Sequence, residues 1–382
     1  MLKIINGHIK TMHGADIENG EVLIDGAKIV EVGEKVEDQA GATVIDAEGR
    51  LVTPGLVDAH CHIGVEDSGI SGSMGRDCNE CSDPATPQVR AIDSIYPQDC
   101  SLREALEAGV TTAVTGPGSG NVIGGTFAAI KMYGRRVDDM IVKQPVAMKV
   151  AFGENPKNVY GAKGLLPMTR MGTASILREY LEKTKRYMED KESAKNPAYD
   201  VKLEALIPVL KKEIPLKAHC HRVDDIFTAI RIAQEFDVGL TLDHCTDGSL
   251  IANELAREGY GAIVGPSFNR KSKQEIVNKS FHTTVDLNEA GVKIAIMTDA
   301  PETPLEYLAL CAGLAVKSGL DEETAWRAIT IQAAEITGIS DRVGSLEPGK
   351  DADVVIWNGN PLRDIAAHPD RVLVNGEVVV KA

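Results

Sequence analysis

The chain has 382 residues, 43% of them hydrophobic, which is enough for one large α/β barrel with a small second domain. Aromatic residues make up 4%, and 56 acidic against 41 basic residues give a formal net charge of −15. This composition argues against a stacking surface for single-stranded nucleic acid and against binding to a polyanion. No run is long and apolar enough to span a bilayer, and the first residues turn polar too soon for a signal peptide. We therefore expect a cytoplasmic protein, and a homo-oligomer, with no nucleic-acid or membrane partner.

The seven cysteines are scattered along the chain, and their odd number favours reduced thiols over a disulfide framework. Cys78 and Cys81 form a C-x-x-C pair with Cys100 nearby. A zinc knuckle would need a second pair, and a redox motif would need a βαβ setting. Neither is visible, so we interpret this segment as a loop that carries two thiols.

Both ends of the chain are predicted to be β-rich. Residues 1–50 contain Asn6-Gly7, Asn19-Gly20 and Asp25-Gly26, which are dipeptides suited to tight hairpin turns. Near the C-terminus, apolar runs at 352–357, 372–374 and 378–380 flank a further Asn-Gly turn. Neither end is long enough for its own sandwich. We expect residues 1–50 and 345–382 to pair into one small β-sandwich domain that flanks a central domain of residues 51–344.

The central domain alternates predicted strands with predicted helices. Apolar, β-branched runs recur at 110–114, 146–152, 216–219, 240–244, 262–265 and 293–299. This alternation predicts a parallel sheet, and the number of runs and the length favour a (β/α)8 TIM barrel. Between about 155 and 215 we expect no barrel strand. That segment is predicted to hold a long helix, with Ile176 and Leu181 on its apolar side, and a second helix interrupted by Pro208.

His60 and His62 follow the apolar run at 51–57. Because strand side chains alternate between two faces, both histidines point the same way and Cys61 points the other way. Such a pair can chelate a transition metal. Barrel chemistry occurs at the C-terminal ends of strands, and five of the nine histidines and one aspartate end apolar runs: His60, His62, His219, His221, His244 and Asp299. The pattern predicts a metal site with Zn²⁺ as the default ion, and with Mn²⁺, Fe²⁺ or Co²⁺ as alternatives.

The chain resembles the amidohydrolase superfamily, in its imidazolonepropionase-like group of metal-dependent hydrolases. The matching pieces are Val52-Thr53-Pro54-Gly55-Leu56-Val57-Asp58-Ala59-His60-Cys61-His62, Leu106-Glu107-Ala108-Gly109-Val110-Thr111-Thr112, Ala218-His219-Cys220-His221, Asp243-His244, Thr298-Asp299 and Val343-Gly344-Ser345-Leu346-Glu347-Pro348-Gly349-Lys350-Asp351-Ala352-Asp353-Val354. The resemblance implies a (β/α)8 barrel with a small sandwich from both termini. It implies that His60, His62, His219 and His244 are metal ligands. It also implies that Asp299 accepts the proton of the attacking water and returns it to the leaving group.

The bridging ligand is where the chain departs from the family pattern. Members with two metals usually carry a carbamylated lysine on the fourth strand, whereas others use a glutamate and hold one or two metals. Lys149 lies within the predicted strand, and Glu154 ends it. An unpaired buried ammonium is unfavourable, and carbamylation would turn Lys149 into an anionic ligand. Both candidates stay open, and so does the metal count.

Two further residues are candidates for substrate contact. His221 faces the same way as His219, and is either a substrate contact or outer ligand, or a structural hydrogen-bonding residue. Arg222 could bind a substrate carboxylate, or pair with Asp224 or Asp225. The glycine-rich segment 116–125 follows the second strand. It could present backbone N–H groups to an anion, but it lacks the Lys-Ser/Thr of a P-loop, and we interpret it as a loop at the barrel mouth.

From these observations we expect a metal-dependent hydrolase that acts on a carbon–nitrogen bond of a small molecule, most simply an amide. Dipeptides, N-acyl amino acids and cyclic amides fit this chemistry. One alternative is a deaminase of a nitrogen heterocycle, and another is a catalytically silent metal-binding scaffold. The intact set of histidines with Asp299 speaks against the last.

Overall fold

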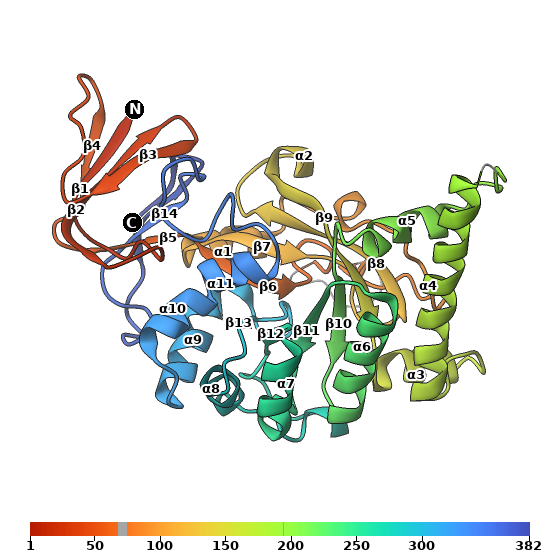
Figure 1. Cartoon of the computed structure of the whole chain (residues 1–382). Coiled ribbons are helices and arrows are strands. Elements are labelled where there is room, and N and C mark those ends of the chain that lie inside the picture. Colours follow the sequence, from red (N-terminus) through yellow and green to blue (C-terminus); the bar gives the residue numbers. More distant parts are fainter. Residues whose placement is uncertain (68–74, 194) are drawn as a thin grey trace.

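The computed structural model describes residues 1–67, 75–193 and 195–382. Their strands form two sheets, a terminal sheet built from both ends of the chain and a barrel sheet built from its centre (Figure 1). Within these residues no helix combines the length and the apolar character that crossing a membrane requires.

The terminal sheet joins the two ends of the chain in one hydrogen-bonded sheet. Along its main path the order is β16-β15-β14-β5-β1-β2-β3, and β4 pairs with β1. β5 connects the halves, because it lies parallel to β1 and antiparallel to β14. The predicted pairing of the termini is thus observed, whereas a two-sheet sandwich stays a prediction. The strands are β1 (Leu2–Ile9), β2 (Ile17–Asp25), β3 (Lys28–Gly33), β4 (Thr43–Asp46), β5 (Leu51–Pro54), β14 (Val354–Trp357), β15 (Pro369–Val374) and β16 (Glu377–Lys381).

The barrel sheet has eight strands in chain order. They are β6 (Leu56–Cys61), β7 (Val110–Thr115), β8 (Ile123–Lys131), β9 (Ile141–Ala151), β10 (Leu216–Cys220), β11 (Leu240–His244), β12 (Gly261–Val264) and β13 (Ile294–Ile296). The first and last strands are joined at their ends, where Asp299 N–H donates to His60 O over 3.2 Å and His62 N–H donates to Ala300 O over 2.7 Å. These two bonds bring Asp299 beside the two histidines of the β6 end.

One strand breaks the regular (β/α)8 alternation that we predicted. β8 runs antiparallel to both β7 and β9, and no crossover helix separates it from β7. The glycine-rich segment before β8 allows the chain to reverse tightly, since a Cβ on Gly116 would lie 2.4 Å from the Phe127 ring. The other neighbouring strands are parallel, as predicted.

Helices cover the outside of the barrel (Figure 1). They are α1 (Cys100–Glu107), α2 (Val137–Met140), α3 (Glu154–Gly161), α4 (Arg170–Glu192), α5 (Val201–Leu210), α6 (Val223–Phe236), α7 (Ala252–Glu258), α8 (His282–Glu289), α9 (Leu308–Lys317), α10 (Glu322–Ala328) and α11 (Ile331–Ile336). Short 3₁₀ turns are η2 (Ala91–Asp93), η3 (Gly248–Ile251), η4 (Gln274–Ile276) and η5 (Leu305–Tyr307). The described residues between 155 and 215 hold α3, α4 and α5 and no strand, which confirms that prediction.

Apolar packing separates the barrel interior from the helix layer. Val57, Ala59 and Phe127 belong to one cluster of buried apolar residues, whereas Cys61 and Cys220 belong to a second cluster that includes buried residues of α1, α6 and α9. Cys220 shares that second cluster with Leu216 and Ala218, as alternation along β10 predicts. On β6 a register shift between Asp58 and Cys61 interrupts the alternation, so Cys61 does not share the cluster of Val57 and Ala59. Both thiols therefore pack against the helix layer. All seven cysteines are free.

Candidate active site

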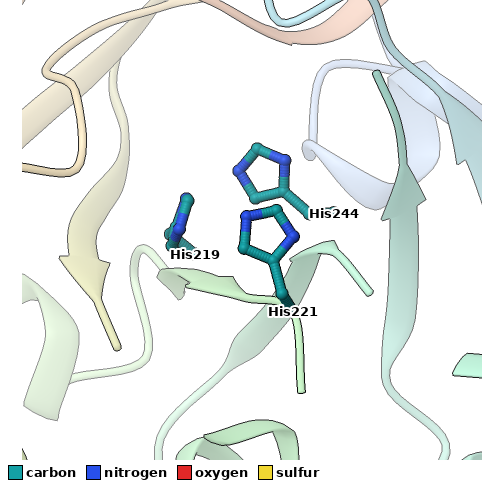
Figure 2. Close-up of side chains that lie close together, drawn as sticks. All are labelled: His219, His221 and His244. Carbon is teal, nitrogen blue, oxygen red and sulfur yellow. The ribbon is translucent and has the colours of Figure 1, made fainter. Parts of the chain in front are cut away.

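Six ionisable side chains gather where the barrel strands end, in two groups. His60, His62 and Asp299 form one group, in which the possible ligand atoms lie within 4.8 Å of one another. His219, His221 and His244 form the other, with the same spacing. Figure 2 shows the three rings of the second group facing a common space beyond the ends of β10 and β11. All six residues are buried.

In the first group the imidazoles converge on a carboxylate. His60 Nε2 and His62 Nε2 each lie 3.3 Å from Asp299 Oδ1. His62 Nδ1 lies 2.7 Å from Gly116 O and must donate to it, because a carbonyl oxygen only accepts. Its other ring nitrogen, Nε2, is the one that faces Asp299. His60 Nε2 and Asp299 Oδ1 are buried without a hydrogen-bond partner among the described residues.

The second group is oriented in the same way. His244 Nδ1 donates to Gly265 O over 2.8 Å, and His221 Nδ1 lies 2.8 Å from Thr246 Oγ1. The Nε2 atoms of His221 and His244 are buried without a hydrogen-bond partner in the described part of the chain. Burial lowers the pKa of His244 to about 3, so its ring is neutral at physiological pH. Neutral imidazoles with free nitrogens are the form that binds a metal.

Asp243 contacts the Nδ1 side of the His60 ring, opposite the nitrogen that faces Asp299. Alternation along β11 does not predict that both Asp243 and His244 reach the site. Oδ2 of Asp243 lies 2.9 Å from His60 Nδ1, and Lys217 Nζ lies 3.3 Å from its other oxygen. Burial alone would raise the pKa of Asp243, but Lys217 and His60 hold it well below its usual range. Asp243 and the next residue, His244, both serve the site because His244 has a φ of 70°, a left-handed conformation that breaks the alternation. A carboxylate behind a ligand histidine orients the ring.

Asp58 holds the β6 and β13 ends together. One of its oxygens accepts from His60 N–H at 2.9 Å, and the other accepts from Thr298 N–H at 2.9 Å and from the Thr298 hydroxyl at 2.6 Å. Burial raises its pKa to about 6. Asp58 thereby positions Asp299, the residue after Thr298. Asp58 was not among the residues singled out from the sequence, although it lies in the family motif at 52–62.

The two candidates for the bridging ligand occupy different environments. Lys149, on β9, is fully buried, and its Nζ has no hydrogen-bond partner among the described residues. Burial lowers its pKa to about 8. Glu154 begins α3 and lies outside both ligand groups, with its Oε1 3.9 Å from Lys273 Nζ.

A cavity of about 500 Å³ opens onto both groups. His62, His219, His221, His244 and Asp299 line it, and Gly118, Ser119 and Gly120 of the β7–β8 loop form part of its wall. Ser119 Oγ lies 2.9 Å from His219 Nδ1, a contact that the sequence did not indicate. Arg222 is not part of the cavity lining; it is 42% exposed and pairs with Asp224 over 3.1 Å, one of the two alternatives considered for it.

Comparison with known proteins identifies the family. The profile of the Amidohydrolase family matches residues 51–379. The chain belongs to the amidohydrolase family. It is similar to an amidohydrolase structure from Thermotoga maritima MSB8, with 40% identity, a TM-score of 0.96 and full coverage of both chains. It is also 26% identical to the imidazolonepropionase of Bacillus velezensis, over 95% of this chain and 88% of that protein.

A further relative is the amidohydrolase tasK of Hapsidospora irregularis, which is 29% identical over 94% of this chain. The match covers only 39% of tasK, so the chain spans about two-fifths of that protein's length. Members of the family are metal-dependent hydrolases, and the two groups of histidines with Asp299 could hold a metal.

Proposed function

We propose that this amidohydrolase cleaves the C–N bond of an amide in a small molecule. The main support for this proposal is that both groups of possible metal ligands border one cavity. Several of their imidazole nitrogens and one carboxylate oxygen are buried without a hydrogen-bond partner among the described residues. Similarity to imidazolonepropionases supports an amide, open-chain or cyclic, as the reacting group. A dipeptide, an N-acyl amino acid or a cyclic amide would fit the cavity of about 500 Å³.

The metal-holding residues in this proposal are His60, His62 and Asp299 on one side, and His219 and His244 on the other. Their donor set of imidazoles and a carboxylate suits Zn²⁺, and also Mn²⁺, Fe²⁺ or Co²⁺. A divalent ion there supplies Lewis-acid chemistry, polarising a carbonyl and acidifying water. Because either group could hold an ion, we include one or two ions in this proposal.

We further propose that a carbamylated Lys149, rather than Glu154, bridges the two sides. Carbamylation requires a neutral amine, and the buried amine of Lys149 has a pKa of about 8, well below the ordinary 10.5. Its Nζ has no hydrogen-bond partner among the described residues, so carbamylation would break no existing hydrogen bond. Glu154 already has Lys273 as a neighbour and is 21% exposed.

Asp299 is the proposed proton carrier. The pKa of Asp299 lies well below its usual range although burial acts in the opposite direction, so the carboxylate is ionised and can accept a proton from water. Its φ of 55° and the bonds from Thr298 to Asp58 fix it over the cavity. Asp299 then returns the proton to the leaving nitrogen. His221, with its free Nε2, is proposed to contact the substrate.

The test is metal analysis of the purified protein, followed by hydrolysis assays on a library of dipeptides, N-acyl amino acids and cyclic amides. We expect amide cleavage that Asp299→Asn lowers by roughly 10²- to 10⁴-fold, the usual contribution of a general acid–base group. Asp224→Asn is the matched control, since Asp224 lies on α6 and outside the cavity lining.

Full activity of Asp299→Asn would refute the proposed proton transfer. Release of ammonia from nitrogen heterocycles without amide cleavage would favour the deaminase alternative. A metal-loaded protein that turns over no compound of either class would favour the silent scaffold. The homo-oligomeric state, the cytoplasmic location and the division into a terminal β-sandwich and a barrel remain predictions from the sequence.

A further inference from the structure

We propose that Lys273 and Lys279 form a subsite that binds a carboxylate of the substrate. Both lysines line the cavity, and both come from the segment between β12 and α8 that includes η4. The inference rests on the proposed function, because it assumes that a substrate amide reacts next to Asp299 in the same cavity.

Lys273 lies beside the second ligand group. Its Nζ donates to Asn155 Oδ1 over 3.1 Å, and Asn155 Nδ2 lies 3.4 Å from His219 Nε2. One amide side chain therefore separates the Lys273 ammonium from a ligand histidine. The only carboxylate of the described residues within 4.0 Å of Lys273 Nζ is that of Glu154, at 3.9 Å, which leaves two of the three N–H donors of Lys273 without a short partner.

Lys279 is bound by neutral groups. Its Nζ donates to Asn269 Oδ1 and, over 3.1 Å, to Arg270 O. No carboxylate of the described ranges lies within 4.0 Å of it. Burial lowers the pKa of Lys279, although Glu302 acts in the opposite direction. A partly desolvated ammonium without a close counter-ion favours an incoming anion.

Two glutamates that line the cavity, Glu66 and Glu302, follow residues of the first ligand group. Glu66 N–H donates to His62 O over 3.0 Å, and Glu302 N–H donates to Asp299 O over 2.9 Å, so both glutamates adjoin the first ligand group. Asn269 stands between the charges, because its Nδ2 lies 3.3 Å from Glu302 Oε2 while its Oδ1 accepts from Lys279. Lys273 is thus linked to the second group through Asn155, and Lys279 is separated from Glu302 by the Asn269 side chain.

This arrangement points to a substrate with a carboxylate a few bonds away from the scissile amide, as in an N-acyl amino acid or the C-terminal residue of a dipeptide. With the amide next to Asp299, the carboxylate would extend toward Lys273 and Lys279. Neutral amides would lack this contact and would bind less tightly.

The probe is 4-oxopentanoate, the ketone isostere of an N-acetylated glycine, compared with neutral 5-hydroxypentan-2-one. Neither compound contains a C–N bond, so binding is measured without any hydrolysis. Isothermal titration calorimetry on the metal-loaded protein measures binding of both compounds to wild type and to the variants. The variants are Lys273→Gln, Lys279→Gln, the double glutamine variant, Lys273→Arg and Lys279→Arg. Lys271→Gln is the control, because Lys271 is an exposed cation of the same segment that does not line the cavity.

We expect wild type to bind the carboxylate at least about tenfold more tightly than the alcohol, from charge-assisted hydrogen bonds. The double glutamine variant should lose this preference, while the arginine variants and Lys271→Gln should keep it. Melting temperatures equal to that of wild type would show that the variants are folded. An unchanged preference in the folded double variant would overturn the proposal, as would an equal loss in Lys271→Gln. A protein that keeps the lysine-dependent preference but cleaves no amide would refute the proposed function and leave the subsite standing.

Discussion

Replacing Lys149 by methionine should stabilise the metal-free protein and prevent normal metal loading. Lys149 is fully buried, and no described residue hydrogen-bonds to its Nζ. Its pKa falls from 10.5 to about 8 because burial disfavours the ammonium. Each pKa unit corresponds to about 1.4 kcal/mol, so the charged lysine destabilises the folded metal-free state by about 3 kcal/mol near pH 7. Methionine has a similar volume and no charge.

The extra stability of Lys149→Met over wild type should decrease as the pH rises. Below pH 8 the amine is protonated in both the folded and the unfolded state, and the full penalty is present. Between about pH 8 and pH 10.5 the unfolded chain binds more protons, so the stability of wild type rises with pH. The advantage of Lys149→Met should fall from about 3 kcal/mol at pH 7 to about 2 kcal/mol at pH 9.

Urea unfolding with a chelator present, at pH 7 and pH 9, measures the difference in unfolding free energy between Lys149→Met and wild type. Metal analysis after zinc loading measures how much metal the variant binds. Lys217→Met is the matched control. Lys217 is equally buried, but its Nζ donates to Ala59 O over 2.9 Å and contacts Asp243 at 3.3 Å, so its loss should destabilise the fold. A destabilised Lys149→Met, or a gain that does not change with pH, would refute the reasoning. Full metal content in Lys149→Met would refute the bridging role.

Two other carboxylates lead to predictions. Asp351→Asn should lower the free energy of unfolding by about 2–3 kcal/mol at pH 7, because burial would raise the pKa of Asp351 but Arg342, Lys131 and Lys28 lower it from 3.8 to about 2. This contribution is present above pH 4 and is lost as the pH falls through 2, so urea unfolding of wild type and variant should converge in acid; a constant difference would contradict it. Asp243→Asn should weaken zinc binding by about 10- to 100-fold, since Asp243 orients His60. Competition with a chelating dye measures that affinity, and an unchanged value would remove Asp243 from the site.

Much of the fold could be predicted because its signals are local. The apolar runs that end in His60, His219 and His244 are strands, and the long amphipathic segment after 170 is a helix. The strand β8 was not among the predicted strands, and part of it lies in the segment 116–125 that was interpreted as a loop. Its direction could not have been predicted either, since an apolar run has the same alternation whether it pairs parallel or antiparallel. Only the chain reversal between β7 and β8, with Gly116 against Phe127, decides it.

The candidate site, like the fold, has features that local sequence patterns predict and features that they do not. The placement of the histidines and Asp299 at strand ends could be predicted from the residue pattern, because alternation acts over a few neighbouring residues. Three features required the folded structure: which of these side chains share a group, the contact of Asp243 with His60, and the positions of Glu154 and Lys149. Glu154 lies outside both groups, whereas Lys149 is buried with no hydrogen-bond partner for its Nζ among the described residues. These contacts join residues far apart in the chain, and they depend on strand order, on register and on the left-handed backbone at His244. Periodicity carries no information about any of the three.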